Sequence, residues 1–362
     1  MKERNYGIDA LRMLLMLMVV VLHVLGKGGI LESAEYRTPN YYIAWFLEIA
    51  CYCAVNCYAL ITGYVYYNKK YQITPAVMLW LQTIFYTVTM FLIDVFFSDI
   101  KLSPGVLLDA FTPITRKIYW YVSAYFGLLL IMPLLNIIVN VINRTQTITF
   151  VVVSVIFFML LPSAINSDPY GLSGGYSMIW LAFLYLMGAL IRKFGLDARF
   201  SSRKCFFVYL ASVSISAFGK FLIEFATTYL LGEPKGGYMF ATYLSPLIVL
   251  AALALFLCFN QLRPCLGLQK LIRFASPAAF GVYLIHCHPF WFERMGDRFA
   301  SLASVSPVRM LAGILISSVC FYMVCIVIDL IRLWLFEKLQ VKELLKKFEA
   351  KIRVKYDAFL AK

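Results

Sequence analysis

Residues 8–25, IDALRMLLMLMVVVLHVL, carry Arg12 and His23 inside a predominantly apolar run. About twenty apolar residues are enough to cross a bilayer as a helix. Arg12 and His23 are eleven positions apart, which on a helix turns through about 1,100° and returns both side chains to one face. The same offset separates them by about 16 Å along the axis. Because ionisable residues inside a membrane are costly, this stripe is a functional-site hypothesis.

The whole chain has the composition of an integral membrane protein. It is 62% hydrophobic and 14% charged over 362 residues, with a mean hydropathy of +0.79, whereas soluble domains carry about 25% charged residues. The net charge of +14 is explained by cytoplasmic loops rich in lysine and arginine. We therefore predict an all-α polytopic membrane protein that is embedded in the lipid bilayer and has no nucleic-acid partner.

The apolar runs predict about ten transmembrane helices. With the N-terminus inside, 21 of the 33 lysines and arginines lie on the inner side, nine on the outer side and three within spans. This imbalance obeys the positive-inside rule and places both termini in the cytoplasm. The predicted spans are residues 8–26, 41–66, 75–97, 119–142, 147–165, 176–192, 205–231, 239–259, 273–292 and 310–336.

The chain divides into a transmembrane domain, residues 1–336, and a basic segment, residues 337–362. Apolar residues recur at helical spacing in the second part, with lysines between them, as in a helix that lies on an anionic membrane surface. A helix that docks on the protein's own loops explains the pattern equally well.

Two of the three histidines fall at the same predicted depth. His23 lies near the outer end of the first span, and His286 lies in the outer part of the ninth span, which runs in the same direction. A single histidine in a membrane is often only a packing residue, but two at one depth above Arg12 favour proton-transfer chemistry. Imidazole gains and loses a proton near neutral pH, so it can act as a base or as a nucleophile.

Other polar groups have simpler explanations. In the sequence His286-Cys287-His288, neighbours on one helix do not face each other, so we predict no metal site. Lys220 and Glu224, four residues apart, form a structural ion pair or line the path of a carrier. No internal repeat of the kind found in many transporters is present, which argues against the carrier. Trp120-Tyr121 is either part of an aromatic belt or part of a site at the level of the histidines.

These segments together resemble the membrane-bound acyltransferase-3 family over nearly the whole chain. The most specific element is the Arg-x10-His pattern of Arg12 and His23. Many members carry Arg-x-x-Arg at the start of the third span, where this chain has Lys69 and Lys70 instead. The remaining matching segments are Thr62-Gly63-Tyr64, Trp120-Tyr121-Val122-Ser123, Gly175-Tyr176-Ser177, Tyr185-Leu186-Met187-Gly188 and Phe280-Gly281-Val282-Tyr283-Leu284-Ile285-His286.

The resemblance implies an enzyme of the bacterial cytoplasmic membrane that has no attached esterase-like domain. Members of the family move acetyl or other acyl groups from cytoplasmic acyl-CoA to hydroxyls of surface or lipid-linked saccharides. Acetyl-CoA would be a co-substrate and not a permanently bound cofactor, and a homodimer is left open. Some relatives form the membrane domain of glycopeptide-resistance serine racemases, where an amino-acid transport role is proposed. A carrier or flippase for a polar solute or a glycan therefore remains the alternative.

The resemblance and the charge pattern together assign roles to individual residues. Arg12, Lys69 and Lys70 are expected to bind the phosphates of CoA, although lysine lacks the planar fork of arginine. His23 is expected to act as a general base or as an acyl carrier. The oxyanion of the thioester needs a hydrogen-bond donor, for which the candidates at the right level are Tyr121, Ser123 and His286.

Overall fold

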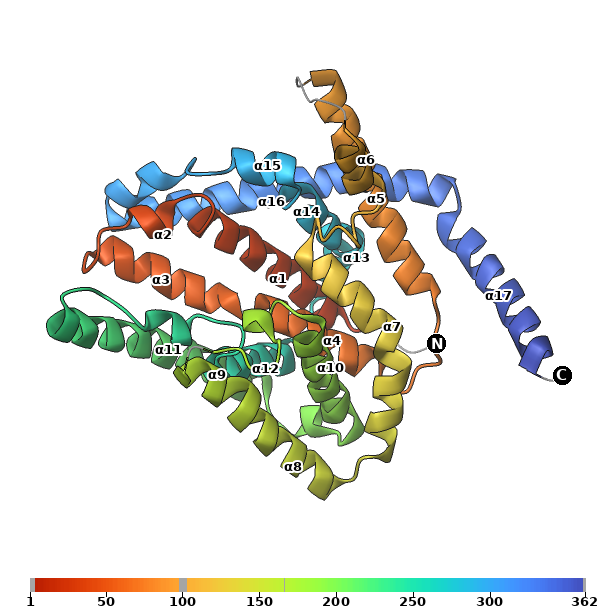
Figure 1. Cartoon of the computed structure of the whole chain (residues 1–362), viewed down its shortest axis with the longest axis horizontal. Coiled ribbons are helices and arrows are strands. Elements are labelled where there is room, and N and C mark those ends of the chain that lie inside the picture. The colour runs from red at the N-terminus through yellow and green to blue at the C-terminus, as the bar shows by residue number, and fades with distance from the viewer. Residues whose placement is uncertain (1–3, 98–102, 166, 361–362) are drawn as a thin grey trace.

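A computed structural model describes residues 4–97, 103–165 and 167–360 of the chain (Figure 1). Within these ranges every regular element is a helix. Among the described residues, seven helices are long and apolar enough to cross a membrane. The prediction of an all-α polytopic membrane protein is therefore confirmed.

The long apolar helices account for seven of the predicted spans. They are α1 (Tyr6–Leu25), α3 with α4 (Pro39–Tyr52 and Ala54–Tyr66), α5 (Thr74–Phe97), α7 (Trp120–Val141), α8 with α9 (Arg144–Ser154 and Leu161–Ile165), α11 (Ser202–Leu231) and α16 (Pro307–Lys338).

Shorter helices occupy the other three predicted spans, and the total of ten crossings stays a prediction. These helices are α10 (Met178–Lys193), α12 (Pro246–Asn260), α13 (Leu266–Ala275), α14 (Ala279–His286) and α15 (Pro289–Arg294). Two further short helices are α2 (Ile30–Ser33) and α6 (Pro104–Phe111).

The prediction of one continuous helix over residues 273–292 is wrong. A 3-10 turn over Ser276–Ala278 separates α13 from α14, and α14 ends at His286 before Pro289 opens α15. Proline has no N–H to donate and disfavours helical backbone at the preceding residue. His286 consequently lies at the end of a short helix, beside a break in the backbone.

Helix α1, drawn in red in Figure 1, is packed on several sides by other helices. It contacts α3, α4, α12, α13, α14 and α16. Leu11, Leu15, Val20 and Leu25 of α1 are fully buried. A helix that is apolar around most of its circumference belongs in a core, so the stripe with Arg12 and His23 faces protein.

Helices α4 and α10 approach each other unusually closely. A Cβ on Gly63 would lie 1.9 Å from the carbonyl oxygen of Tyr185, and one on Gly188 would lie 2.0 Å from that of Leu60. Small residues permit such backbone contact between membrane helices. This contact fixes α4 against the bundle, and α4 reaches α1 through Tyr58, whose hydroxyl donates to the carbonyl of Arg12 at 2.7 Å.

The buried charges of α11 form a self-contained cluster. Lys220 and Glu224 are almost completely buried, and the ammonium of Lys220 donates to the Glu224 carboxylate. The hydroxyl of Tyr41 donates to the same carboxylate at 2.9 Å. Paired and hydrogen-bonded charges tolerate burial, so the geometry agrees with the structural interpretation of this pair.

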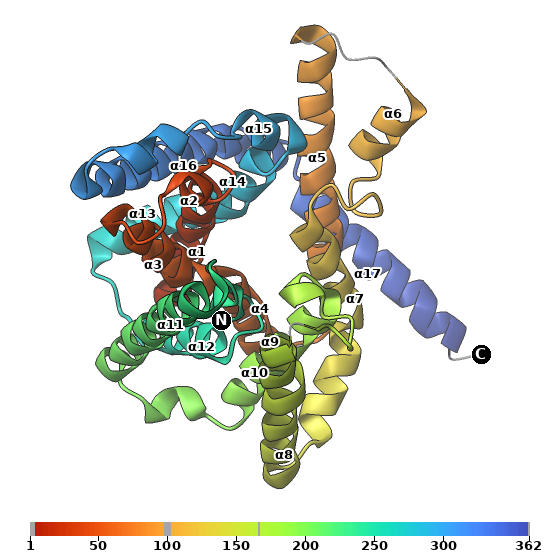
Figure 2. The same ribbon diagram turned by 60° about the vertical axis from the view of Figure 1, so that its left-hand side comes forward.

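The basic segment forms helix α17 (Val341–Leu360), which extends away from the helix bundle (Figure 1). In Figure 2, α5, α6, α7 and α17 lie on one side of the molecule and α3, α11 and α13 lie on the other. Of the predicted segment, residues 361 and 362 lie outside the described residues. Leu344 and Phe348 of α17 are exposed, as expected for a helix that also contacts a membrane surface.

Helix α17 nevertheless docks on the start of α5 through Glu349. The Glu349 carboxylate accepts hydrogen bonds from the backbone N–H groups of Ile73 and Thr74 at 3.0 and 3.2 Å and from the Thr74 hydroxyl. These are donors that a helix start leaves unsatisfied. Burial by itself would raise the pKa of Glu349. The hydrogen bonds from Ile73 and Thr74 lower it by more than burial raises it, so the pKa lies below its ordinary value. Arg353 adds a bond to the carbonyl of Tyr71 at 2.8 Å.

Candidate active site

The two histidines at the same predicted depth are in contact. Nδ1 of His23, on α1, lies 2.9 Å from Nε2 of His286, at the end of α14. His286 is fully buried, whereas His23 is partly exposed. The residues come from helices that lie 263 positions apart in sequence, and the packing of α1 against α14 brings them together.

The hydrogen bonds of His286 fix the proton positions of the neutral pair. Nδ1 of His286 lies 2.6 Å from the carbonyl oxygen of Val282. A carbonyl only accepts hydrogen bonds, so this nitrogen carries the proton and Nε2 of His286 is an acceptor. His23 therefore donates from Nδ1, which leaves the lone pair of its Nε2 available for a base or a nucleophile.

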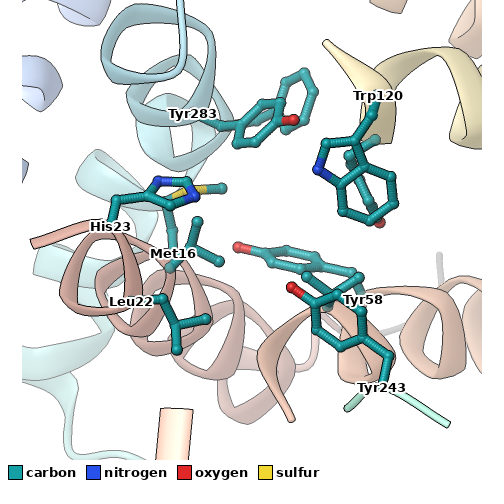
Figure 3. A pocket seen from close by; sticks show the side chains of 11 residues that line it. Met16, Leu22, His23, Tyr58, Trp120, Tyr243 and Tyr283 are labelled. Atoms are coloured by element: carbon teal, nitrogen blue, oxygen red, sulfur yellow. The ribbon is translucent and has the colours of Figure 1, made fainter. Parts of the chain in front are cut away.

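His23 lines a small cavity of about 40 Å³ in the middle of the protein. In Figure 3, His23 and Trp120 project from opposite walls of this cavity, with Tyr283 and Tyr58 between them. The lining is mostly apolar and aromatic, as is typical of small-molecule sites. Tyr121 also lines it.

Two larger cavities adjoin this middle cavity. The one that the predicted topology places on the inner side has a volume of about 330 Å³ and is lined by Arg12 among others. The one on the predicted outer side has a volume of about 200 Å³ and is lined by Cys287 and Glu293 among others. They are called the inner and outer cavities below. The inner and middle cavities share Tyr58, Tyr121 and Phe280, and the middle and outer cavities share His23, Trp120 and Tyr283.

The three cavities form a row with a narrow centre, and His23 lies at that centre. A middle cavity of about 40 Å³ has room for only a few water molecules, because each needs at least about 10–15 Å³ on this measure. His23 is thus accessible from a larger cavity on either side, and the space directly beside it holds little water.

Arg12 supplies positive charge at the inner cavity. Its Nη1 donates to Asp9 at 3.0 Å, and its side chain remains 35% exposed. The Lys69 ammonium lies 4.8 Å from the ring centre of Tyr66, which lines the same cavity. Lys70 follows on the same loop and is exposed. Arg12 therefore lines the cavity itself, whereas Lys69 lies beside one of its lining residues and Lys70 follows Lys69 in sequence.

The three candidates for an oxyanion donor differ in availability. Tyr121 lines the inner and middle cavities. The Ser123 hydroxyl is engaged by the carbonyl of Ile114 at 2.6 Å. Both ring nitrogens of His286 already have partners within the protein, and its role as a donor stays a prediction.

Sequence reasoning missed Cys287. Its Sγ lies 3.5 Å from Nδ1 of His23 and 3.4 Å from Nε2 of His286. Neighbours on one helix do not face each other, but in the structure the residue that joins His286 and Cys287 is His23 from α1 and not His288. His288 instead accepts a hydrogen bond from the backbone of Phe290 at 3.2 Å and lines a different cavity.

The comparison with protein families agrees with this architecture. A family model described as an acyltransferase domain matches residues 5–330. The chain belongs to the acyltransferase-3 family and is a membrane acyltransferase. The matched range contains both histidines and all three cavities, and it leaves α17 outside. No curated protein and no solved structure matches the chain.

Proposed function

We propose that this protein transfers an acetyl or similar acyl group from cytoplasmic acyl-CoA to a hydroxyl of a cell-surface or lipid-linked saccharide at the bacterial cytoplasmic membrane. The observation that carries the proposal is the position of His23. It lies in a narrow cavity between an inner cavity with Arg12 and an outer cavity that is larger. A donor and an acceptor held on opposite sides of the membrane can meet there.

The inner cavity suits the donor. Phosphates are recognised by charge-assisted hydrogen bonds, and arginine provides the stronger, planar donor set. Arg12, Lys69 and Lys70 would bind the phosphates of CoA, and its thin thioester arm would extend between Tyr58 and Tyr121. The rise of about 16 Å from Arg12 to His23 is of the same order as the reach of such an arm.

The outer cavity suits a polar acceptor. Glu293 at its edge carries a carboxylate that can accept hydrogen bonds from hydroxyls, and Trp120 and Phe292 present aromatic faces. The Lys27 ammonium forms an ion pair with the Glu293 carboxylate at 3.0 Å. An acceptor hydroxyl that enters here meets the free Nε2 of His23.

His23 can then serve as the general base. Its Nε2 takes the proton of the hydroxyl while the oxygen attacks the thioester carbonyl, and the carbon–sulfur bond to CoA breaks. The CoA thiolate takes up the proton from His23. The positive imidazolium is stabilised because its Nδ1–H donates to Nε2 of His286, and Tyr121 is the candidate donor to the oxyanion. An acyl-imidazole formed first at the same Nε2 is the alternative order of events.

Label transfer in a reconstituted system tests this function. The purified protein in liposomes receives acetyl-CoA labelled in the acetyl group and a pool of lipid-linked glycans. We expect the label to become covalently attached to a glycan. Uptake of intact solute without label transfer would contradict the proposal and favour the carrier.

A further inference from the structure

Three ligand atoms, one from α1 and two from the end of α14, converge beside the middle cavity. They are Nδ1 of His23, Nε2 of His286 and Sγ of Cys287, and all lie within 4.8 Å of one another. We propose that these residues form a binding site for a zinc-class divalent ion, and that the bound ion blocks acyl transfer. The binding itself is independent of the proposed function, and only the inhibition depends on it.

The distances match a zinc site closely. Tetrahedral zinc with bonds of about 2.0–2.1 Å to nitrogen and 2.3 Å to sulfur separates two nitrogens by about 3.3 Å and a nitrogen from a sulfur by about 3.6 Å. The two nitrogen–sulfur distances here are 3.5 and 3.4 Å. The nitrogen–nitrogen distance is 2.9 Å, so insertion of an ion requires the two rings to separate by about 0.4 Å and to turn until both nitrogens point at the ion.

The chemistry of the ligands also fits. Two imidazoles and a thiolate are the donor types that zinc prefers over magnesium or calcium. His286 already donates its other ring proton to the carbonyl of Val282 at 2.6 Å, which is the outer-shell contact that metal-bound histidines usually have. The ligand nitrogen of His286 is thereby held unprotonated and oriented.

The outer cavity would provide access to the ion and room for a fourth ligand. His23 and Cys287 line this cavity together, and its volume of about 200 Å³ accommodates a hydrated ion. Three protein ligands with one open position are typical of zinc sites that keep a water molecule. An ion on the outer side of the membrane can therefore reach the site without crossing the bundle.

Inhibition follows from the position of the proton on His23. A metal at Nδ1 replaces the proton that this nitrogen donates to His286. The neutral ring must then carry its remaining proton on Nε2, so the lone pair that would accept the proton of the substrate is lost. Zinc would act by inverting the tautomer of the base, in addition to separating the two histidines.

Cobalt provides a spectroscopic probe that does not require activity. We expect a titration of the purified protein with Co²⁺ to saturate near one equivalent, with a thiolate-to-cobalt charge-transfer band. Cys287→Ser should lose this band, and the matched control Cys265→Ser, at an exposed cysteine, should keep it. Absence of the band in the wild-type protein overturns the proposal, as does its persistence in Cys287→Ser. Cys287→Ala provides the same comparison if the serine variant does not fold.

Acyl transfer tests the second part of the proposal. Zn²⁺ should inhibit the wild-type protein, EDTA should restore the rate, and Mg²⁺ should have no effect. With each variant compared with its own zinc-free rate, Cys287→Ser should need at least about 10-fold more Zn²⁺ for the same inhibition. A cobalt band without inhibition by zinc would overturn the inhibitory role alone. A lack of any acyl transfer would overturn the proposed function and leave the cobalt test valid.

Discussion

Replacement of His23 by alanine is expected to lower acyl transfer by about 10²- to 10⁴-fold, the range for a positioned general base. The free Nε2 of His23 is the group that receives the proton in the mechanism proposed above. His286 cannot replace it, because His286 is fully buried and does not line the middle cavity. The rate of label transfer from acetyl-CoA, measured with an amount of folded protein established by size-exclusion chromatography, tests the prediction.

A second histidine variant controls for general damage. His288 accepts a hydrogen bond from the backbone N–H of Phe290, and asparagine is a good residue at such a helix start. His288→Asn is therefore expected to stay within a few-fold of the wild-type rate. Near-normal turnover in a well-folded His23→Ala protein would remove His23 from the catalytic role and leave it a packing role.

Replacement of Arg12 by alanine is expected to weaken CoA binding by about 10- to 100-fold. A lost charge-assisted contact is worth about 1.5–3 kcal/mol, which corresponds to this range of affinity. The variant should fold, because Arg4 also contacts Asp9, at 2.6 Å, and keeps that carboxylate paired. Calorimetric titration with CoA measures the effect, and Arg12→Lys should restore affinity only in part.

Two further variants serve as controls for the CoA titration. Arg273→Ala removes the same charge from an exposed position on the predicted cytoplasmic side and should leave CoA affinity unchanged. His23→Ala should also leave it close to wild type, because His23 lies at the far end of the proposed donor path. If His23→Ala lost CoA binding and Arg12→Ala retained it, the assignment of the donor to the inner cavity would be wrong.

The properties that were predictable from the sequence are those set by short-range geometry and composition. The chain is mostly apolar, and inside a bilayer a helix satisfies the hydrogen bonds of its own backbone, so a helical membrane protein was predictable. The offset between Arg12 and His23 follows from helix geometry alone, and the structure places the two residues at neighbouring cavities. The pairing of Lys220 with Glu224 needs only their spacing on one helix.

The properties that were missed depend on packing between distant segments. The contact between His23 and His286 arises because α1 packs against α14. A common depth in the membrane does not tell whether the two side chains point toward each other. Cys287 reaches the site because the helix breaks after His286, and Pro289 was the readable sign of that break. The docking of Glu349 on the start of α5 is likewise a tertiary contact.

Sidedness is the most direct test of the central claim that donor and acceptor meet at His23 from opposite faces of the membrane. Sealed inside-out vesicles that contain the protein and a glycan acceptor in the lumen are given labelled acetyl-CoA from outside, where the cytoplasmic face is exposed. Right-side-out vesicles serve as the control. We predict that label reaches the luminal glycan in the inside-out vesicles only. Transfer solely when acetyl-CoA and the glycan are on the same side of the membrane would contradict the account.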